Sequence, residues 1–282
     1  MQKTQKITIL IENTVGASKK LISEWGISIL IETSDVRVLF DTGARGNLML
    51  NALAMGIDLK FVDLLVMSHG HYDHSGGMQA FLQFRGIVPV YAHPDFFSLH
   101  YANSPEKRYI GVPFRKEELE SLGAQFIFTR KPKQIAPNMW ISGEIPRKTD
   151  FEQVDKHLIC LKDNGKFTPD PMLDDMSLYI ATSEGLVIIS GCAHSGLVNT
   201  IKHAQKVTGI DNIYGIIGGT HLGPASELQL KATIGFLKSL NLKFLAVNHC
   251  TGFEVMSKLY NTFCSKFHFA PAGTVFSLPL SI

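Results

Sequence analysis

The stretch Ser68-His69-Gly70-His71-Tyr72-Asp73-His74-Ser75-Gly76-Gly77 decides the fold of this chain. It follows the apolar run FVDLLVMS of Phe61 to Ser68, which is typical of a strand buried on both faces. Three imidazoles and one carboxylate therefore fall within six residues at the end of a predicted buried strand. A solvated polar loop has no need of this combination, so the pattern predicts a metal site.

The residues of this motif divide between two neighbouring metal positions. Imidazole nitrogen and carboxylate oxygen are ligands that suit zinc. His69 and His71 would face one metal, whereas Asp73 and His74 would face a second. Glycines in the motif allow backbone turns that a side chain would forbid. The motif therefore predicts two divalent metal ions as cofactors, with Zn2+ as the best match.

Composition excludes several other classes of protein. The chain has 282 residues, of which 45% are hydrophobic and 18% charged, so it can bury a sizeable core and is not disordered. A net charge of +2 gives no electrostatic footprint for nucleic acid, and no segment reaches the roughly 18 apolar residues that span a membrane. The segment Met1 to Ile11 lacks the pattern of a signal peptide, and the four cysteines include no CxxC pair. We expect a cytoplasmic protein of one domain, residues 1–282, without nucleic-acid or membrane partners.

The apolar patterns along the chain predict helices inserted between strands. Strands are expected at Ile7–Ile11, Gly26–Glu32, Val36–Phe40, Phe61–Ser68, Val88–Ala92, Ala124–Phe128, Met139–Ser142, Ser177–Ala181, Leu186–Ser190, Ile213–Ile217 and Phe244–Val247. Helices are expected at Asn47–Ala54, after Gly77, and at Glu117–Leu122, Leu197–Val207 and Glu227–Leu240. Residues Pro94–Lys116 and Lys162–Asp175 are expected to be loops, the first a lid, and the chain ends in a strand-like tail. The pattern predicts an α/β sandwich.

An HxHxDH motif after a buried strand resembles that of the metallo-β-lactamase superfamily, and the resemblance covers nearly the whole chain. It implies an αββα sandwich, with two mixed sheets and helices on the outer faces. The superfamily also has an aspartate that closes an early strand, matched here by Phe40-Asp41-Thr42-Gly43. The resemblance implies that Asp41 holds the metal loop without binding a metal. The simpler alternative is a turn or helix-capping aspartate.

Further motifs are similar to one subgroup of this superfamily. They are GCAHSG at 191–196, GGTHL at 218–222, NHCTG at 248–252 and GEIPR at 143–147. The subgroup includes proteins ascribed a dihydropteroate-synthase-like activity in archaeal methanopterin synthesis, alongside bacterial members without a settled role.

The remaining metal ligands depart from the superfamily pattern at two positions. Cys192 stands where better-known members carry a bridging aspartate, and Asp174 and Asp175 stand where an HxxGH-type loop is usual. We expect His194 to complete the first metal site and His249 the second, with a helix-cap or turn histidine as the alternative. Cys192 is either a thiolate ligand or a small buried hydrophobe. Asp175 is a further candidate ligand.

Two residues are expected to meet the substrate. His221 follows a Gly-Gly turn at a strand end, where it would bind substrate, polarise its leaving group or hydrogen-bond a ligand. A helix begins at 195–199, and its free backbone N–H groups would favour a phosphate or carboxylate beside Asn199. The other histidines (His93, His100, His157, His203 and His268) show no ligand spacing, and Cys160, Cys250 and Cys264 are expected to be structural thiols.

The chemistry of such a site points first to hydrolysis. Two zinc ions about 3.5–4 Å apart share a water and lower its pKa toward neutrality. Asp73 would position the resulting hydroxide or take its proton. We therefore predict a metal-dependent hydrolase acting on an anionic small molecule such as a phosphorylated one. By resemblance, the alternative is a transferase that joins an arylamine to a hydroxymethyl-dihydropterin diphosphate. A third hypothesis is a metal-binding sensor without turnover.

Overall fold

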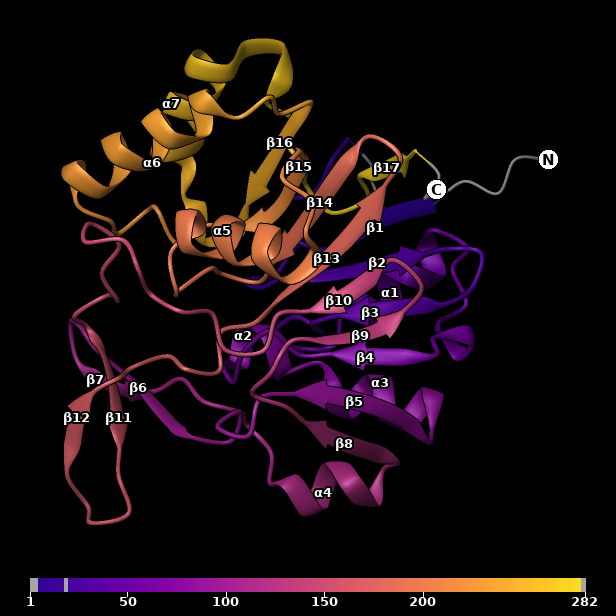
Figure 1. The fold of residues 1–282 in the computed structure, drawn as a ribbon. Helices are drawn as coiled ribbons and strands as arrows, with labels where there is room; N and C mark the ends of the chain where they lie inside the picture. Colours follow the sequence, from indigo (N-terminus) through magenta and orange to yellow (C-terminus); the bar gives the residue numbers. More distant parts are fainter. Residues whose placement is uncertain (1–4, 18–19, 280–282) are drawn as a thin grey trace.

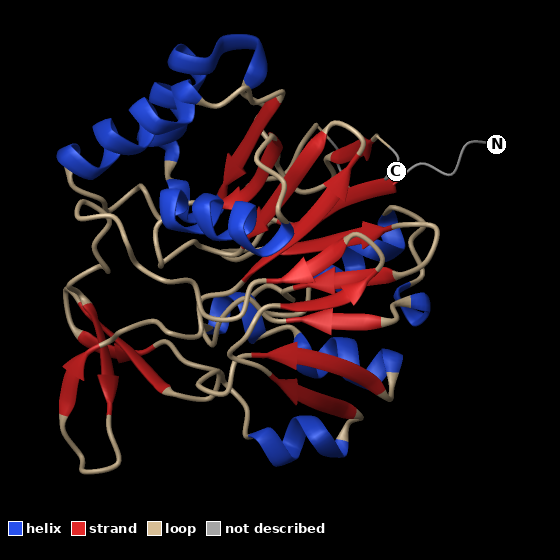
Figure 2. Cartoon of the chain, viewed as in Figure 1, coloured by secondary structure: helices blue, strands red, loops and turns tan. Residues whose placement is uncertain are grey.

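Two mixed β-sheets pack face to face in the computed structural model, which describes residues 5–17 and 20–279 (Figure 1). Helices lie along the outer faces of both sheets, as the colouring by secondary structure shows (Figure 2). The expected αββα sandwich of the metallo-β-lactamase type is therefore confirmed. Residues 1–4 of the expected N-terminal lead lie outside the described residues.

The N-terminal sheet has seven strands in the order β17-β1-β2-β3-β4-β5-β8. Their bounds are Val275–Leu278, Gln5–Ile11, Ser28–Glu32, Arg37–Phe40, Leu64–Val66, Val88–Ala92 and Ala124–Phe128. The sheet is antiparallel from β17 to β3 and parallel from β3 to β8. Helices α1 (Leu48–Ala54), α3 (Met78–Arg85) and α4 (Lys116–Ser121) pack on its outer face.

The C-terminal sheet has six strands in the order β16-β15-β14-β13-β10-β9. Their bounds are Phe244–Asn248, Ile213–Gly219, Gly185–Ser190, Ser177–Thr182, Met139–Ile141 and Lys133–Ala136. Strands β14, β15 and β16 are parallel, so their carboxyl ends meet at one edge of the sheet. Helices α5 (Leu197–Thr208), α6 (Glu227–Ser239) and α7 (Phe253–Phe263) cover its outer face.

The apolar core lies between the sheets because strand side chains alternate between two faces. In β2, Ile29 and Ile31 join the inner core, whereas Leu30 between them packs against the outer helices. In β14, Ile189 faces inward and Ile188 faces α5 and α6. Both faces are thus apolar, which explains the continuous apolar runs in the sequence.

The metal-binding motif follows β4 and enters the short helix α2 (Tyr72–Ser75). Figure 1 shows α2 beside the open ends of the two sheets. The remaining short helices are single 3-10 turns at Leu59–Phe61, His249–Thr251 and Cys264–Lys266. The second of these begins directly after β16, at the same edge as the carboxyl ends of β14 and β15.

Two segments expected to be loops instead form most of a third sheet. It is antiparallel, has the order β12-β11-β6-β7 and stands apart from the two layers at the lower left of Figure 1. The bounds are Phe167–Pro169, Leu158–Leu161, Leu99–Asn103 and Lys107–Tyr109. The prediction of loops was wrong here because β6 is formed by pairing with β11, which lies more than fifty residues further along the chain and leaves no local pattern. The expected strand-like tail was also incomplete, because α7 precedes β17.

Among residues 5–17 and 20–279, no helix combines the length and the apolar character needed to cross a bilayer.

Candidate metal centre

Three histidines from two loops form the first candidate metal site. His69 and His71 follow β4, and His194 follows β14. One ring nitrogen from each lies within 4.8 Å of the others. His69 Nε2 is 3.0 Å from His71 Nδ1. All three side chains are buried, so the nitrogens converge on a space shielded from solvent.

A second candidate site lies beside the first and combines a carboxylate with two imidazoles. Asp73 and His74 come from α2, and His249 comes from the 3-10 turn after β16. Asp73 Oδ2 lies 3.8 Å from His74 Nε2 and 3.4 Å from His249 Nε2. The structure therefore brings together the residues that the sequence assigned to the second metal.

Several buried nitrogens of these clusters lack the hydrogen-bond partners that buried polar atoms require. His71 Nε2, His249 Nε2 and both ring nitrogens of His194 have no hydrogen-bond partner within the described part of the chain. Each such buried atom costs about 1–3 kcal/mol when nothing binds it. Burial also lowers the pKa of His71 to about 3 and that of His69 and His194 well below the usual value. Neutral imidazole is the form that binds metals, so His69, His71 and His194 fit a divalent ion.

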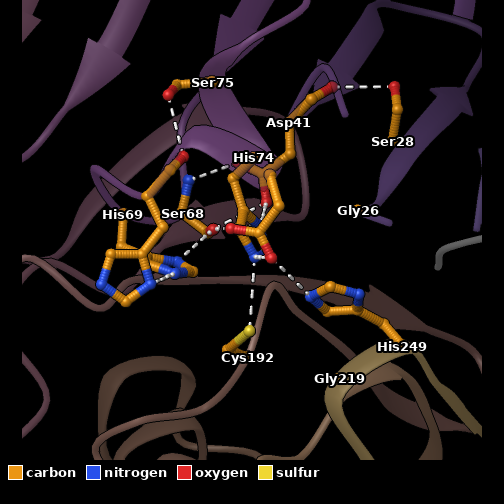
Figure 3. A network of polar contacts seen from close by, with 12 residues as sticks. Gly26, Ser28, Asp41, Ser68, His69, His74, Ser75, Cys192, Gly219 and His249 are labelled. Carbon is orange, nitrogen blue, oxygen red and sulfur yellow. Dashed lines mark hydrogen bonds and ion pairs between the residues drawn. The ribbon is translucent and has the colours of Figure 1, made fainter. Parts of the chain in front are cut away.

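Asp41 fixes the orientation of the metal loop from behind. Its Oδ2 accepts hydrogen bonds from His74 Nδ1 at 2.7 Å and Ser68 Oγ at 2.6 Å, while Oδ1 accepts from the Ser68 backbone at 2.7 Å (Figure 3). Burial opposes charge on His74, but Asp73 and Asp41 outweigh it and raise the pKa of His74 to about 9. Because Nδ1 is bonded to Asp41, Nε2 of His74 faces Asp73. Asp41 itself belongs to none of the ligand clusters among the described residues.

Cys192 also faces this centre. Its Sγ lies 3.3 Å from His74 Nε2 and forms a cluster with His69 and His74. Burial raises the pKa of the Cys192 thiol well above its usual range. The same sulfur belongs to another cluster with His221 and Cys250, a cysteine that the sequence analysis treated as structural.

Strained backbone marks the carboxyl ends of the three parallel strands. Ala193 follows β14 with φ 56°, His221 follows β15 with φ 47°, and His249 follows β16 with φ 53°. A left-handed conformation at a residue other than glycine costs about 1–3 kcal/mol and is typical of functional sites. Gly70 in the metal loop is needed for close approach of the backbone and not for a left-handed turn. A Cβ there would lie 1.9 Å from the Phe96 carbonyl oxygen.

The start of α5, where the sequence predicted an anion site, is occupied by a carboxylate of the chain itself. The Glu152 carboxylate already accepts hydrogen bonds from the Val198 and Asn199 backbone N–H groups, at 2.7 and 2.9 Å. The Asn199 side chain is buried, and its amide oxygen accepts from the backbone N–H groups of Lys148 and Thr149. This helix end is therefore capped from within the chain, and the structure gives Asn199 no free group for a substrate.

The structure separates the two aspartates that precede β13. Asp175 Oδ2 accepts from the Ser195 backbone at 2.8 Å, and Asp174 Oδ2 accepts from the Gly70 backbone at 2.7 Å. Neither belongs to a candidate ligand cluster in the described ranges, and both instead hold the backbone of loops that carry candidate ligands. His221 lies at the rim, with its ring centroid 4.2 Å from that of His194 and its Nε2 3.6 Å from Asp155.

His100 is a buried histidine beside the first cluster that the sequence patterns did not predict to belong to the site. Its Nδ1 donates to Asp170 Oδ2 at 2.6 Å, and its Nε2 lies 3.5 Å from Asp174 Oδ2. Burial opposes charge here too, but the two carboxylates raise the pKa of His100 to about 10. Its ring packs edge-on against His71 at 5.2 Å between centroids. No motif spacing reveals this residue, because its partners come from a loop about seventy positions away.

Fold and ligand clusters together define a metallo-β-lactamase-type protein, and the family comparison agrees. The model of the metallo-β-lactamase superfamily matches residues 27–195, and the chain belongs to this superfamily. It is 33% identical over 280 residues to 7,8-dihydropterin-6-methyl-4-(β-D-ribofuranosyl)-aminobenzene-5'-phosphate synthase of Methanocaldococcus jannaschii, covering 96% of this chain and 95% of the relative.

Two further comparisons span most of the chain. An uncharacterised protein of the same archaeon is 34% identical, with 90% of this chain and 93% of that protein covered. Among solved structures, Tm1679, described as a metal-dependent hydrolase of the β-lactamase superfamily, has a TM-score of 0.83 and 26% identity, with 98% and 99% of the two chains covered. The expected resemblance to the superfamily and its subgroup is therefore confirmed.

Proposed function

We propose that this protein holds two divalent metal ions, with Zn2+ as the best match to its donor atoms. His69, His71 and His194 would hold the first ion. Asp73, His74 and His249 would hold the second, with the Cys192 sulfur as an additional ligand on the side of His74. The support is the set of unpartnered buried ring nitrogens, which a bound cation would satisfy. Because one apolar core is shared by both large sheets, we further propose that residues 1–282 act as one domain.

On this centre, we propose a transferase that joins an arylamine to a hydroxymethyl-dihydropterin diphosphate. In this reaction the bond between the methylene carbon and the diphosphate oxygen breaks. A bond between that carbon and the amine nitrogen forms, and the nitrogen loses one proton. The single observation that carries this proposal is the 33% identity to the archaeal synthase over 96% of the chain. The sequence alone favoured hydrolysis, and the relative's name shifts the preference to transfer.

The residues of the chain have distinct roles in this proposal. Bound divalent ions would supply positive charge that stabilises the departing diphosphate. Although burial opposes ionisation, His74 and His249 hold the pKa of Asp73 below its usual range. Asp73 therefore suits an anionic ligand or an orienting group better than a proton acceptor. At the rim, burial opposes charge on His221, but Asp155 and Cys250 raise its pKa to about 9, so a cationic imidazole is available to an anionic substrate.

Hydrolysis remains the second candidate, because the similar structure Tm1679 is described as a metal-dependent hydrolase. In that reaction water replaces the arylamine as the nucleophile, and the same residues would hold the metals. Asp73 would then position the nucleophilic water. The two candidates differ in what must be added to observe turnover.

The deciding experiment supplies zinc-loaded protein with hydroxymethyl-dihydropterin diphosphate, with and without an arylamine. The transferase releases diphosphate only when both substrates are present, and mass spectrometry detects the pterin-amine product. A hydrolase releases phosphate or diphosphate without the amine, and a panel of phosphoesters extends that test. Metal binding without turnover of any substrate supports the sensor hypothesis. Chelation and His249→Ala serve as negative controls for either catalytic reaction.

A further inference from the structure

Two cysteines from separate turns meet beside the candidate metal centre. Cys192 follows β14, and Cys250 lies in the 3-10 turn after β16. Their sulfurs lie within 4.8 Å of each other, and the Cys250 thiol donates to the Cys192 carbonyl oxygen at 3.8 Å. The Cys250 sulfur also accepts from the His221 backbone N–H at 3.2 Å, which fixes its position. Two thiols 58 positions apart are therefore neighbours, although the sequence contains no CxxC pair.

The fold makes room for this contact at the end of β15, the strand between β14 and β16. That strand ends at Gly219, where a Cβ would lie 2.7 Å from the Cys250 sulfur and 3.2 Å from the Cys192 Cα. A larger residue there would therefore push the two turns apart. A left-handed residue adjoins each cysteine, Ala193 in the first turn and His249 in the second. Backbone strain of this kind is typical of functional sites.

The two sulfurs are close enough to form a disulfide bond. Both cysteines are free in this structure, and an S–S bond of about 2.05 Å requires them to close a gap of at most about 2.8 Å. Rotation about the two Cα–Cβ bonds moves each sulfur between staggered positions and can close such a gap. The other cysteines, Cys160 on β11 and Cys264 in the 3-10 turn after α7, share no ligand cluster with this pair among the described residues.

The Cys192 sulfur has a second set of neighbours that competes with Cys250. It lies 3.3 Å from His74 Nε2 and forms a cluster with His69 and His74. The thiolate is the form of cysteine that binds a metal, and a sulfur in a disulfide is no longer a thiolate. Bond formation with Cys250 would therefore remove the sulfur ligand from the proposed second metal.

We propose that Cys192 and Cys250 form a reversible disulfide when a hydroperoxide is the oxidant, and that this bond weakens the second metal site. The disulfide itself is independent of the proposed reaction, whereas its effect on the metal rests on the proposed second metal site. A thiol reductant restores both cysteines by thiol–disulfide exchange. The pair thus links the metal content of the protein to the oxidants around it.

The chemistry begins at Cys250, because it is the less buried of the two cysteines. Its sulfur attacks hydrogen peroxide, the O–O bond breaks, and the S–H proton leaves with the released hydroxyl as water. The product is a sulfenic acid on Cys250. The Cys192 sulfur then attacks that sulfur, its proton and the sulfenic hydroxyl leave as a second water, and the S–S bond forms. Together the two thiols lose two electrons, which the peroxide gains.

The first test detects the disulfide in the zinc-loaded full chain without any substrate. Cys264→Ser removes the exposed thiol and leaves three cysteines. Hydrogen peroxide should lower the free thiols of this variant from three to one, and peptide mass spectrometry should find Cys192 joined to Cys250. Adding Cys250→Ser should abolish the cross-link, whereas adding Cys160→Ser, at a buried cysteine on β11, should retain it. Oxidation that stops at a sulfinic acid on Cys250, or a cross-link to Cys160, would overturn the proposal.

The second test measures zinc affinity before and after oxidation, by competition with a chromogenic chelator. The disulfide should weaken one of two zinc equivalents at least about tenfold, the smaller effect seen when a supporting contact is lost. Peroxide-treated Cys250→Ser should keep its affinity, because Cys192 is only 3% exposed and has no partner thiol there.

The outcomes separate this inference from the proposed metal site and reaction. If the cross-link forms and both zinc affinities stay the same, Cys192 is not a metal ligand and the proposed effect on the metal is wrong. If peroxide leaves all the thiols intact while two zinc ions bind, the redox pair is wrong and the metal site stands. A third zinc equivalent that Cys250→Ser removes would also overturn the proposal, because the two sulfurs would then hold a metal of their own. None of these readouts depends on turnover.

Discussion

Replacing His100 by glutamine should disturb the first metal site through a buried ion pair. His100 lies between Asp170 and Asp174, with its Nδ1 2.6 Å from the first carboxylate and its Nε2 3.5 Å from the second. Asp174 in turn accepts the Gly70 N–H at 2.7 Å, directly between His69 and His71. The His100 side chain therefore connects the third sheet to the loop that carries two ligands.

The size of the effect follows from the pKa of His100. A folded-state value of about 10 against 6.5 for a free histidine corresponds to about 5 kcal/mol in favour of the charged, folded form. Because the folded pKa is raised, this stabilisation is complete below about pH 6.5 and is lost as the pH rises toward 10. In His100→Gln two buried carboxylates lose their cation, and breaking a buried pair typically costs 3–5 kcal/mol.

The assay compares denaturant unfolding of wild type and His100→Gln at several pH values in the same metal state. We expect a difference of about 3–5 kcal/mol near pH 6 that shrinks toward pH 10. Zinc titration should show one of two metal equivalents bound about 10–100-fold more weakly. His93→Gln is the matched control, since His93 is also buried against a carboxylate, with Nε2 3.0 Å from Glu144. A pH-independent difference, or zinc binding unchanged relative to this control, would refute the reasoning.

Four further predictions concern the metals and their supports. Removing the metals with a chelator should lower the thermal unfolding midpoint by about 10 °C, because a metal at a thousandfold excess over its Kd adds about 4 kcal/mol to the free energy of unfolding. An unchanged midpoint would contradict metal binding. Asp41→Asn should weaken the second metal about 10–100-fold in zinc titrations, because His74 loses its carboxylate partner. Glu152→Gln should cost about 1–2 kcal/mol in denaturant unfolding without changing zinc binding, because it acts on the start of α5. Cys192→Ala should abolish sulfur-to-metal charge-transfer absorption in the cobalt-loaded protein, whereas Cys160→Ala, also buried but on β11, should retain it.

Local patterns in the sequence predicted the parts of the site that depend on neighbours along the chain. The HxHxDH motif lies where a buried strand ends, and each of His194, His221 and His249 follows an apolar strand. Parallel strands place their carboxyl ends at one edge, so residues in these positions meet even though they are distant in sequence. The αββα arrangement with two mixed sheets followed instead from the resemblance of the HxHxDH motif to that of the superfamily, since the pattern of helices and strands alone predicted an α/β sandwich.

The parts that sequence analysis missed all depend on pairing between distant segments. His100 is an unremarkable histidine in a segment without period until β6 pairs with β11 and the following loop brings Asp170 against its ring. The start of α5 resembled an anion site because nothing near it in sequence fills it, yet Glu152 reaches it from a loop forty-six residues earlier. Sequence spacing identifies free helix ends, but only the folded chain shows which of them are already occupied.

The chain departs from the superfamily's usual ligand pattern at Asp175, yet both three-residue clusters remain intact. Asp175 stands where the sequence analysis looked for a ligand, and its carboxylate instead holds the backbone of Ser195, next to His194. That contact helps to hold His194, a proposed ligand, close after β14, where the backbone includes a left-handed residue at Ala193. The carboxylate that the sequence offered as a further candidate ligand therefore supports the backbone next to the histidine that completes the first cluster. The chain retains a full set of three donors at each proposed metal position, which favours a functional centre over a crippled one.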